Sequence, residues 1–218
     1  MFALGHVLQT YFLCREYAAA NALADELIRL ADEKRALHWQ AWGLIYRVSI
    51  LTLTARNSNA VHNAIQTITS GIATRRDVGA TIDTPFYLSQ LAWAYSRANQ
   101  YNDAWRCIEE AVAIVETSKE RWYEAELHRM AGDIALNSPE QDTARAQTYF
   151  DRALTVARQQ QAKSWELRAA MSTARLWRDQ GKRDEARELL APVYGWFTEG
   201  FDTRDLKDAK ALLDELAA

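Results

Sequence analysis

The feature that most constrains the fold is a repeated helical stripe, which is clearest between Pro85 and Glu116. Its first part falls at positions i, i+3, i+4 and i+7, one face of a helix, and consists of Leu88, Leu91, Ala92 and Tyr95. The second part follows a turn and consists of Ala104, Ile108 and Ala111. Small residues let two helices touch, and large residues fill the gaps between successive units, so this segment predicts a helix–turn–helix repeat.

The order of small and large residues in this segment resembles the tetratricopeptide pattern, and the same frame fits most of the chain. It predicts an all-α fold, a single domain over 1–218 that forms a right-handed solenoid of about five helix pairs with a C-terminal capping helix. The predicted units are roughly 1–34, 35–80, 84–118, 120–160 and 163–198, and the capping helix covers 203–216. Such a helix is expected because the open end of a solenoid exposes an apolar face.

The second unit admits two frames. One uses Trp39, Trp42, Gly43 and Tyr46, and the other uses Leu44, Val48 and Leu51 followed by Ala60 and Ala64. Its second helix, from Ala60 to Arg75, is polar and β-branched and is the weakest helical prediction in the chain.

Composition supports helix and excludes several classes of protein. The chain has 37 alanines but only 8 glycines and 3 prolines, and alanine is the residue most easily held in a helix. A formal net charge of -3 gives no basic field, so we expect no direct binding of nucleic acid. Apolar runs stay short of the roughly 18 residues that a membrane span needs. The segment from Met1 to His6 lacks the features of a signal peptide, which favours a cytoplasmic protein.

No pattern of catalysis or metal binding stands out. The four histidines, His6, His38, His62 and His128, include no pair at i, i+4. The sequence contains no phosphate-binding P-loop and no Gly-x-Ser-x-Gly elbow. Both cysteines, Cys14 and Cys107, fall within apolar helical patterns and are expected to be buried free thiols. We therefore predict a protein that is not an enzyme, with no catalytic residues, no metal site and no cofactor.

Four stretches resemble the tetratricopeptide tails of large bacterial signalling proteins: Glu120–Gly132, Gln160–Ala170, Ala174–Gln180 and, most specifically, Leu190–Thr203. In that family the tails follow a class III adenylate/guanylate cyclase domain, or a winged-helix regulator domain, and a P-loop ATPase module. The resemblance implies a regulatory or scaffolding array that binds a protein or peptide partner, or attached domains of its parent protein. The catalytic functions of that family do not carry over, because the chain contains neither a cyclase domain nor a P-loop.

The tetratricopeptide frame turns one face of each unit's first helix toward a concave groove. The predicted groove residues are Phe86 and Trp93 in the third unit, His128 in the fourth, and Arg168, Arg175 and Arg178 in the fifth. Arginines there would fork onto the carboxylates or phosphates of a partner or, alternatively, of a small anionic effector. Two other interpretations stay open: Trp93 packs between units, and the arginines pair with neighbouring acids such as Glu166, Asp179 and Glu188.

The two ends of the chain carry further expectations. The apolar repeat pattern begins at Phe2, with no polar capping repeat before it. This predicts that the chain is either the tail of a longer protein or associates with itself through the first unit. Near the other end, an aromatic cluster either anchors the capping helix or forms an adhesive surface, and it consists of Tyr194, Trp196, Phe197 and Phe201.

Overall fold

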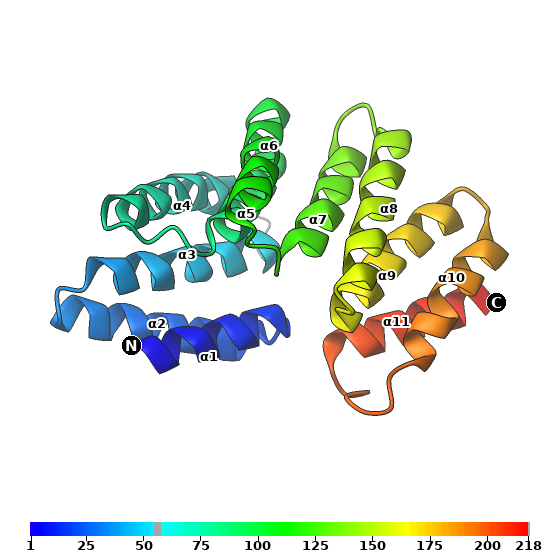
Figure 1. Ribbon diagram of the computed structural model, residues 1–218, viewed down its shortest axis with the longest axis horizontal. Helices are drawn as coiled ribbons and strands as arrows, with labels where there is room; N and C mark the ends of the chain where they lie inside the picture. The colour runs from blue at the N-terminus through cyan, green and yellow to red at the C-terminus, as the bar shows by residue number, and fades with distance from the viewer. Residues whose placement is uncertain (55–57, 218) are drawn as a thin grey trace. The chain divides into compact units, whose positions relative to one another are not determined.

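The computed structural model describes residues 1–54 and 58–217, and this part of the chain is helical throughout, with eleven helices and no strand (Figure 1). The first six are α1 (Phe2–Leu13), α2 (Tyr17–Glu33), α3 (Leu37–Thr54), α4 (Ser58–Asp77), α5 (Thr84–Arg97) and α6 (Tyr101–Ser118). The other five are α7 (Glu124–Asn137), α8 (Thr143–Gln159), α9 (Lys163–Asp179), α10 (Arg183–Gly195) and α11 (Arg204–Ala217). The predicted all-α class is confirmed.

The helices group into two compact units, Met1–Glu120 and Arg121–Ala218, which are called unit 1 and unit 2 and are distinct from the five predicted repeat units. Unit 1 holds α1 to α6 and unit 2 holds α7 to α11, and each unit is described by itself. Within them, α1 packs on α2, α3 on α4, α5 on α6, α7 on α8 and α9 on α10. Each predicted segment therefore contains one packed helix pair.

In unit 1, small residues are buried on helices that pack together. Ala92 on α5 and Ala104 on α6 are both fully buried where these helices pack. In the second pair, Trp42 and Tyr46 of the first frame are buried, as are Val48 and Ala64 of the second, whereas Leu51 of the second frame is 40% exposed. The uncertain second helix forms as the 20-residue α4, and its core side includes Ala64 and Ile68.

In unit 2, the helix α11 forms over the segment that the sequence predicts as a C-terminal helix. Four residues of α11 are buried against α9 and α10: Leu206, Ala209, Leu212 and Leu216. They extend a core that contains Leu190 and Val193. Another close contact joins α7 to α8, where a side chain at Gly132 would overlap the ring of Phe150.

The surface of α1 is unusual because its sequence has no charged residue. Phe2, Val7 and Tyr11 are exposed on it, by 69%, 43% and 41%. Cys14 is also exposed, so the prediction that both cysteines are buried is wrong for this one, which lies just beyond the end of α1. Self-association through the first helix pair stays a prediction.

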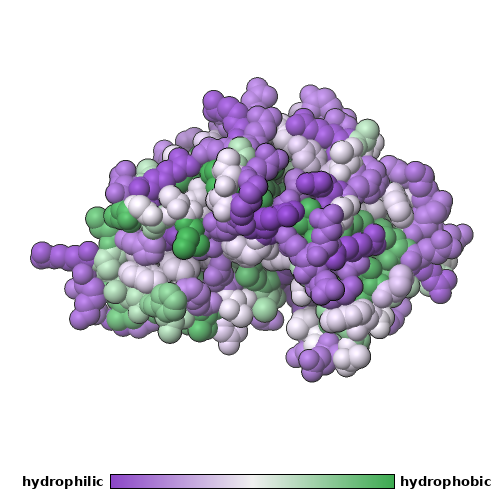
Figure 2. Space-filling view, in the orientation of Figure 1, coloured by the Kyte–Doolittle hydropathy of each residue, from purple (hydrophilic) through white to green (hydrophobic). Residues whose placement is uncertain are grey.

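Elsewhere, hydrophilic residues cover most of the face in view in Figure 2, with hydrophobic residues showing between them. Within the described residues, no helix combines the length and hydropathy of a membrane span.

Candidate functional site

Phe86, a predicted groove residue, lies in the core of unit 1. Its side chain is fully buried, and its ring centroid lies 5.2 Å from that of Tyr46 and 5.6 Å from that of Phe12. Phe12 comes from α1 and Tyr46 from α3, so these helices enclose the first turn of α5. This corrects the prediction: a ligand at the surface does not reach Phe86.

Two other predicted groove residues reach the surface. Trp93, seven residues beyond Phe86 on α5, is partly buried, and its indole Nε1 is buried without a hydrogen-bond partner. Arg175 on α9 is exposed, and its guanidinium lies 4.0 Å from the sulfur of Met171. Trp93 belongs to unit 1 and Arg175 to unit 2.

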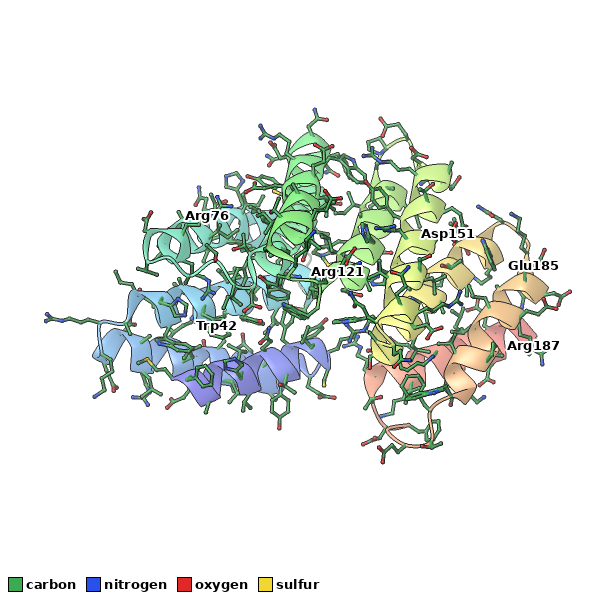
Figure 3. The ribbon with its side chains drawn as sticks, in the orientation of Figure 1. Trp42, Arg76, Arg121, Asp151, Glu185 and Arg187 are labelled. Atoms are coloured by element: carbon green, nitrogen blue, oxygen red, sulfur yellow. The ribbon has the colours of Figure 1, made fainter. Side chains whose placement is uncertain are left out.

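A buried arginine that the sequence analysis did not identify lies at the centre of an aromatic cluster in unit 1. Arg75 on α4 is 3% exposed, and its guanidinium lies 4.8 Å from the ring centroid of Tyr87 and 5.4 Å from that of Trp42 (Figure 3 labels Trp42 on α3). It donates a hydrogen bond to the carbonyl of Ile82 at 3.0 Å and contacts the His38 ring at 3.3 Å. No carboxylate within the described residues forms an ion pair with it.

The cluster also holds unpartnered donors and perturbed titrating groups. The Nε of Arg75, the Nε1 of Trp42 and the hydroxyl of Tyr87 are buried without hydrogen-bond partners among the described residues. Burial, reinforced by the positive charge of Arg75, lowers the pKa of His38 below its ordinary 6.5. A buried cation without a paired carboxylate is costly, because burial removes its hydration.

A groove opens between α4, α5 and α6 in unit 1, with a volume of about 540 Å³. Its walls combine apolar side chains, including Ile72, Leu88 and Leu91, with charged residues. Arg76 of α4, labelled in Figure 3, pairs with Glu110 of α6 at 2.5 Å, so an ion pair joins two of the helices that line the groove. The full lining is Thr69, Ile72, Ala73, Arg76, Asp77, Leu88, Leu91, Tyr95, Asp103, Arg106, Cys107 and Glu110.

The thiol of Cys107, which lines the groove, is unreactive. Burial, together with the carboxylates of Glu110 and Asp103, raises the pKa of Cys107 to about 12. A thiol with so high a pKa is protonated at neutral pH and is a poor nucleophile. The groove therefore has the properties of a binding surface that combines apolar and charged side chains.

In unit 2, the predicted Arg168 belongs to a network of charges on α7, α9 and α11. Its guanidinium lies 2.6 Å from the carboxylate of Asp205 and 3.8 Å from that of Glu126. Glu126 also accepts a hydrogen bond from Arg129 at 2.8 Å, and Arg129 pairs in turn with Asp133. Positive and negative groups alternate through the network, so much of its charge is neutralised within the protein.

Arg178 is also paired within unit 2. It lies 2.8 Å from the carboxylate of Asp179, as one interpretation of the sequence expected, and 3.0 Å from that of Glu215 on α11. Glu166 pairs with other cations, and Glu188 forms no ion pair with the three predicted arginines within the described residues. Internal pairing therefore accounts for Arg168 and Arg178, with Asp179 as a neighbour in sequence and with Asp205 and Glu215 as acids that the fold brings near.

His128 on α7 is a buried, neutral side chain rather than a surface one. It is 7% exposed and stacks on Tyr149 with 6.2 Å between ring centroids. Its Nδ1 is buried without a hydrogen-bond partner. Burial lowers its pKa from 6.5 to about 4, and the opposing charges of Glu124 and Arg152 modify that shift. The prediction that His128 lines an open groove is corrected accordingly.

The burial of His128 predicts a loss of stability in acid. His128 takes up a proton below about pH 6.5 in the unfolded chain but only near pH 4 in the folded protein. Because the unfolded chain binds the proton more readily, the contribution of His128 to stability falls as the pH drops from 6.5 toward 4. We expect the free energy of unfolding to fall by about 2 kcal/mol between pH 7 and pH 5 on account of His128. Urea denaturation at both pH values measures this, and the His128→Gln variant should lose that share of the pH dependence. An equal loss in both proteins would contradict the assignment.

The residues that the sequence analysis missed carry weak local signals. Arg75 falls in the weakest predicted helix, and nothing in its neighbourhood along the chain indicates that it becomes buried. The groove residues of α4 and α6 look like ordinary solvated positions of amphipathic helices.

Within the described part of the chain, no group of three or more histidine, cysteine, aspartate or glutamate side chains is placed to hold a metal ion. Comparison of the chain with protein-family models and with curated proteins returned no match.

Proposed function

We propose that the chain is a non-catalytic protein-interaction domain. In this proposal it is a right-handed, tetratricopeptide-like solenoid of about five helix pairs with a capping helix, and it works in the cytoplasm as the regulatory tail of a larger bacterial signalling protein. Its partner is a protein or peptide, or an attached domain of the same parent protein. The all-helical fold and the helix pairs agree with this proposal.

The observation that carries the proposal is the groove between α4, α5 and α6. An amphipathic helix binds a groove by inserting apolar residues while its polar side chains meet charged edges. The groove offers both kinds of side chain, because its lining includes the apolar Leu88 and Leu91 and the charged Arg76, Arg106 and Glu110. Its volume of about 540 Å³ is enough for a few side chains of such a helix.

The chemistry of the polar groups also favours binding over catalysis. A general acid or base needs a titrating group that reaches a substrate and has a pKa near the working pH. His128 is buried with a pKa of about 4, and Cys107 has a pKa of about 12. Arg168 and Arg178 are held in internal ion pairs.

The test uses a phage-displayed library of helical peptides selected on the full chain. Ala73 is an exposed residue on the groove wall, so Ala73→Trp fills the groove without disturbing the core. Ala18→Trp on α2 is the matched control, since Ala18 is also exposed but does not line the groove. We expect selected peptides to bind the parent and the control equally and to bind Ala73→Trp at least tenfold more weakly. Peptides unaffected by Ala73→Trp, or a failure to select any peptide, would contradict the proposal.

A second candidate function, the sensing of a small anionic effector, is favoured by Arg75. A buried guanidinium with no paired carboxylate, beside two more unpartnered donors, would be stabilised by a bound anion. Phosphate, succinate and citrate are suitable probes, because each presents several acceptor oxygens. An anion that binds only the folded protein raises its thermal midpoint.

Under this second candidate, at least one of the three anions raises the midpoint of the parent protein by several degrees and leaves that of Arg75→Gln unchanged. Equal responses of the two proteins would show that the anion acts elsewhere. A flat response of the parent to all three would leave only the peptide-binding proposal.

A further inference from the structure

The turn between α10 and α11 presents an aromatic side chain to solvent. Trp196, just after α10, is 58% exposed, and Phe201 in the same segment is 47% exposed. Their neighbours Tyr194 and Phe197 pack against the core of unit 2. Phe197 meets Trp196 edge to face, with 5.2 Å between ring centroids. The segment is therefore anchored from one side and displays Trp196 on the other.

This arrangement combines both interpretations of the C-terminal aromatic cluster. Tyr194 and Phe197 anchor the segment that leads to the capping helix, as one interpretation expects. Trp196 and Phe201 remain outside the core. Tryptophan is among the residues that most often dominate binding energy.

Two cations lie beside Trp196. The Nζ of Lys163 lies 5.5 Å from the centroid of its ring. Lys163, Arg158, Gln161 and Trp196 together line a recess of about 440 Å³ in unit 2. The recess thus combines an apolar ring with two positive charges and an amide.

One buried acid balances part of this charge. Glu166 is 5% exposed and lies 2.8 Å from Lys163 and 3.0 Å from Arg158. Burial alone would raise the pKa of Glu166, but hydrogen bonds from the two cations outweigh it and hold that pKa below 4.5. Two positive groups around one carboxylate leave a net charge of about +1 at the recess.

The donors of Arg158 are only partly used. It donates to Glu166 through Nε, and its side chain is 52% exposed. Within the described residues its two terminal amino groups have no partner, and neither Glu199 nor Asp202 of the nearby segment pairs with either cation. The free side of a guanidinium fork matches the two oxygens of a carboxylate.

We propose that the recess around Trp196 is a docking site for an acidic segment of a protein partner. In that segment, an apolar or aromatic residue is next to one or more aspartate or glutamate residues. The apolar residue packs on the face of Trp196, and a carboxylate takes the open side of Arg158. Lys163 repels a basic segment from the same ring, so the surface discriminates by charge as well as by shape. This site lies in unit 2, and it holds whether or not the groove of unit 1 binds a helix.

The experiment selects peptides from a displayed library of random linear 12-mers on the full chain and counts residues in the recovered pool. We expect enrichment of aspartate and glutamate next to aromatic or large apolar residues. Binding of these peptides should fall at least tenfold in Trp196→Ala and in Arg158→Glu. Both side chains are largely exposed, so both variants are expected to keep the parent's helical circular dichroism, and Trp196→Ala its urea midpoint. Arg158→Glu removes one of the two cations beside the buried Glu166, so a modest fall in its urea midpoint is expected while Lys163 still pairs with that acid.

Two matched variants complete the test. Arg187→Glu reverses an exposed arginine of α10 in the same unit (Figure 3), and Tyr11→Ala removes an exposed aromatic ring from α1. Neither should weaken the selected peptides. If Arg187→Glu and Arg158→Glu lost equal amounts of peptide binding, the loss would come from the overall charge of the protein, and the proposal would be overturned. A pool without acidic enrichment, or one that binds Trp196→Ala as well as the parent, would overturn it too.

Discussion

Deletion of residues 203–218 is expected to unfold unit 2 or to leave it as an aggregating remnant. The deleted segment includes α11, whose buried residues are Leu206, Ala209, Leu212 and Leu216. Burying a leucine side chain contributes about 1.5–3 kcal/mol, so three leucines contribute about 5 kcal/mol or more. This is comparable to the whole stability of an ordinary domain, about 5–15 kcal/mol.

The deletion also exposes the surfaces that α11 covers. Leu190 and Val193 of α10 lie in the same core, and they would face water in the truncated protein. We expect a lower urea midpoint by circular dichroism and oligomers by light scattering. Lys207→Glu, on the exposed side of α11, is the control and should leave both measurements unchanged. A truncated chain that stays monomeric with the parent's midpoint would show that α11 does not stabilise unit 2.

Phe86→Ala is expected to lower the free energy of unfolding by about 3–5 kcal/mol, the usual cost of truncating a buried aromatic residue. The ring is fully buried and stacks on Tyr46 with 25° between the ring planes. It also meets Phe12 and Tyr87 nearly edge to face. Removing it leaves a cavity among three aromatic rings on α1, α3 and α5, and such a site does not collapse easily because its walls are large and rigid.

Urea denaturation of Phe86→Ala beside Tyr11→Ala measures this effect. Tyr11 is 41% exposed, so its truncation should change stability by no more than about 1 kcal/mol. The comparison separates the two assignments of Phe86. If Phe86→Ala kept the parent's stability and lost only peptide binding, Phe86 would be a groove residue, as the sequence pattern predicts.

The candidate site was only partly accessible to sequence reasoning. Helices form over the segments where the sequence predicts them, yet the frame turned Phe86 and His128 toward an open surface, whereas both side chains are buried. The tetratricopeptide frame assumes that every pair stacks in the same way. Here α1 and α3 close over the start of α5, and Tyr149 of α8 stacks on His128.

The partners of the arginines show the same limit. Arg178 pairs with Asp179, its neighbour in sequence, and this pair could be anticipated. Arg168 pairs with Asp205, which lies 37 positions away on α11, and no local pattern indicates that contact. Arg75 forms no ion pair with an acid in the described part of the chain, and its guanidinium lies among aromatic rings and a backbone carbonyl.

The sequence by itself determined the helices and their order, because helix formation depends on spacings of three and four residues and on turn residues within a few positions. The alanine-rich stripes also predicted which positions become buried, as at Ala92 and Ala104, for the same reason. Only the tertiary structure decided which helix faces stay open to solvent and which charges are neutralised. Those properties depend on side chains from helices far apart in the chain, such as Arg76 with Glu110 and Lys163 with Trp196, and their distances are set when the helices pack.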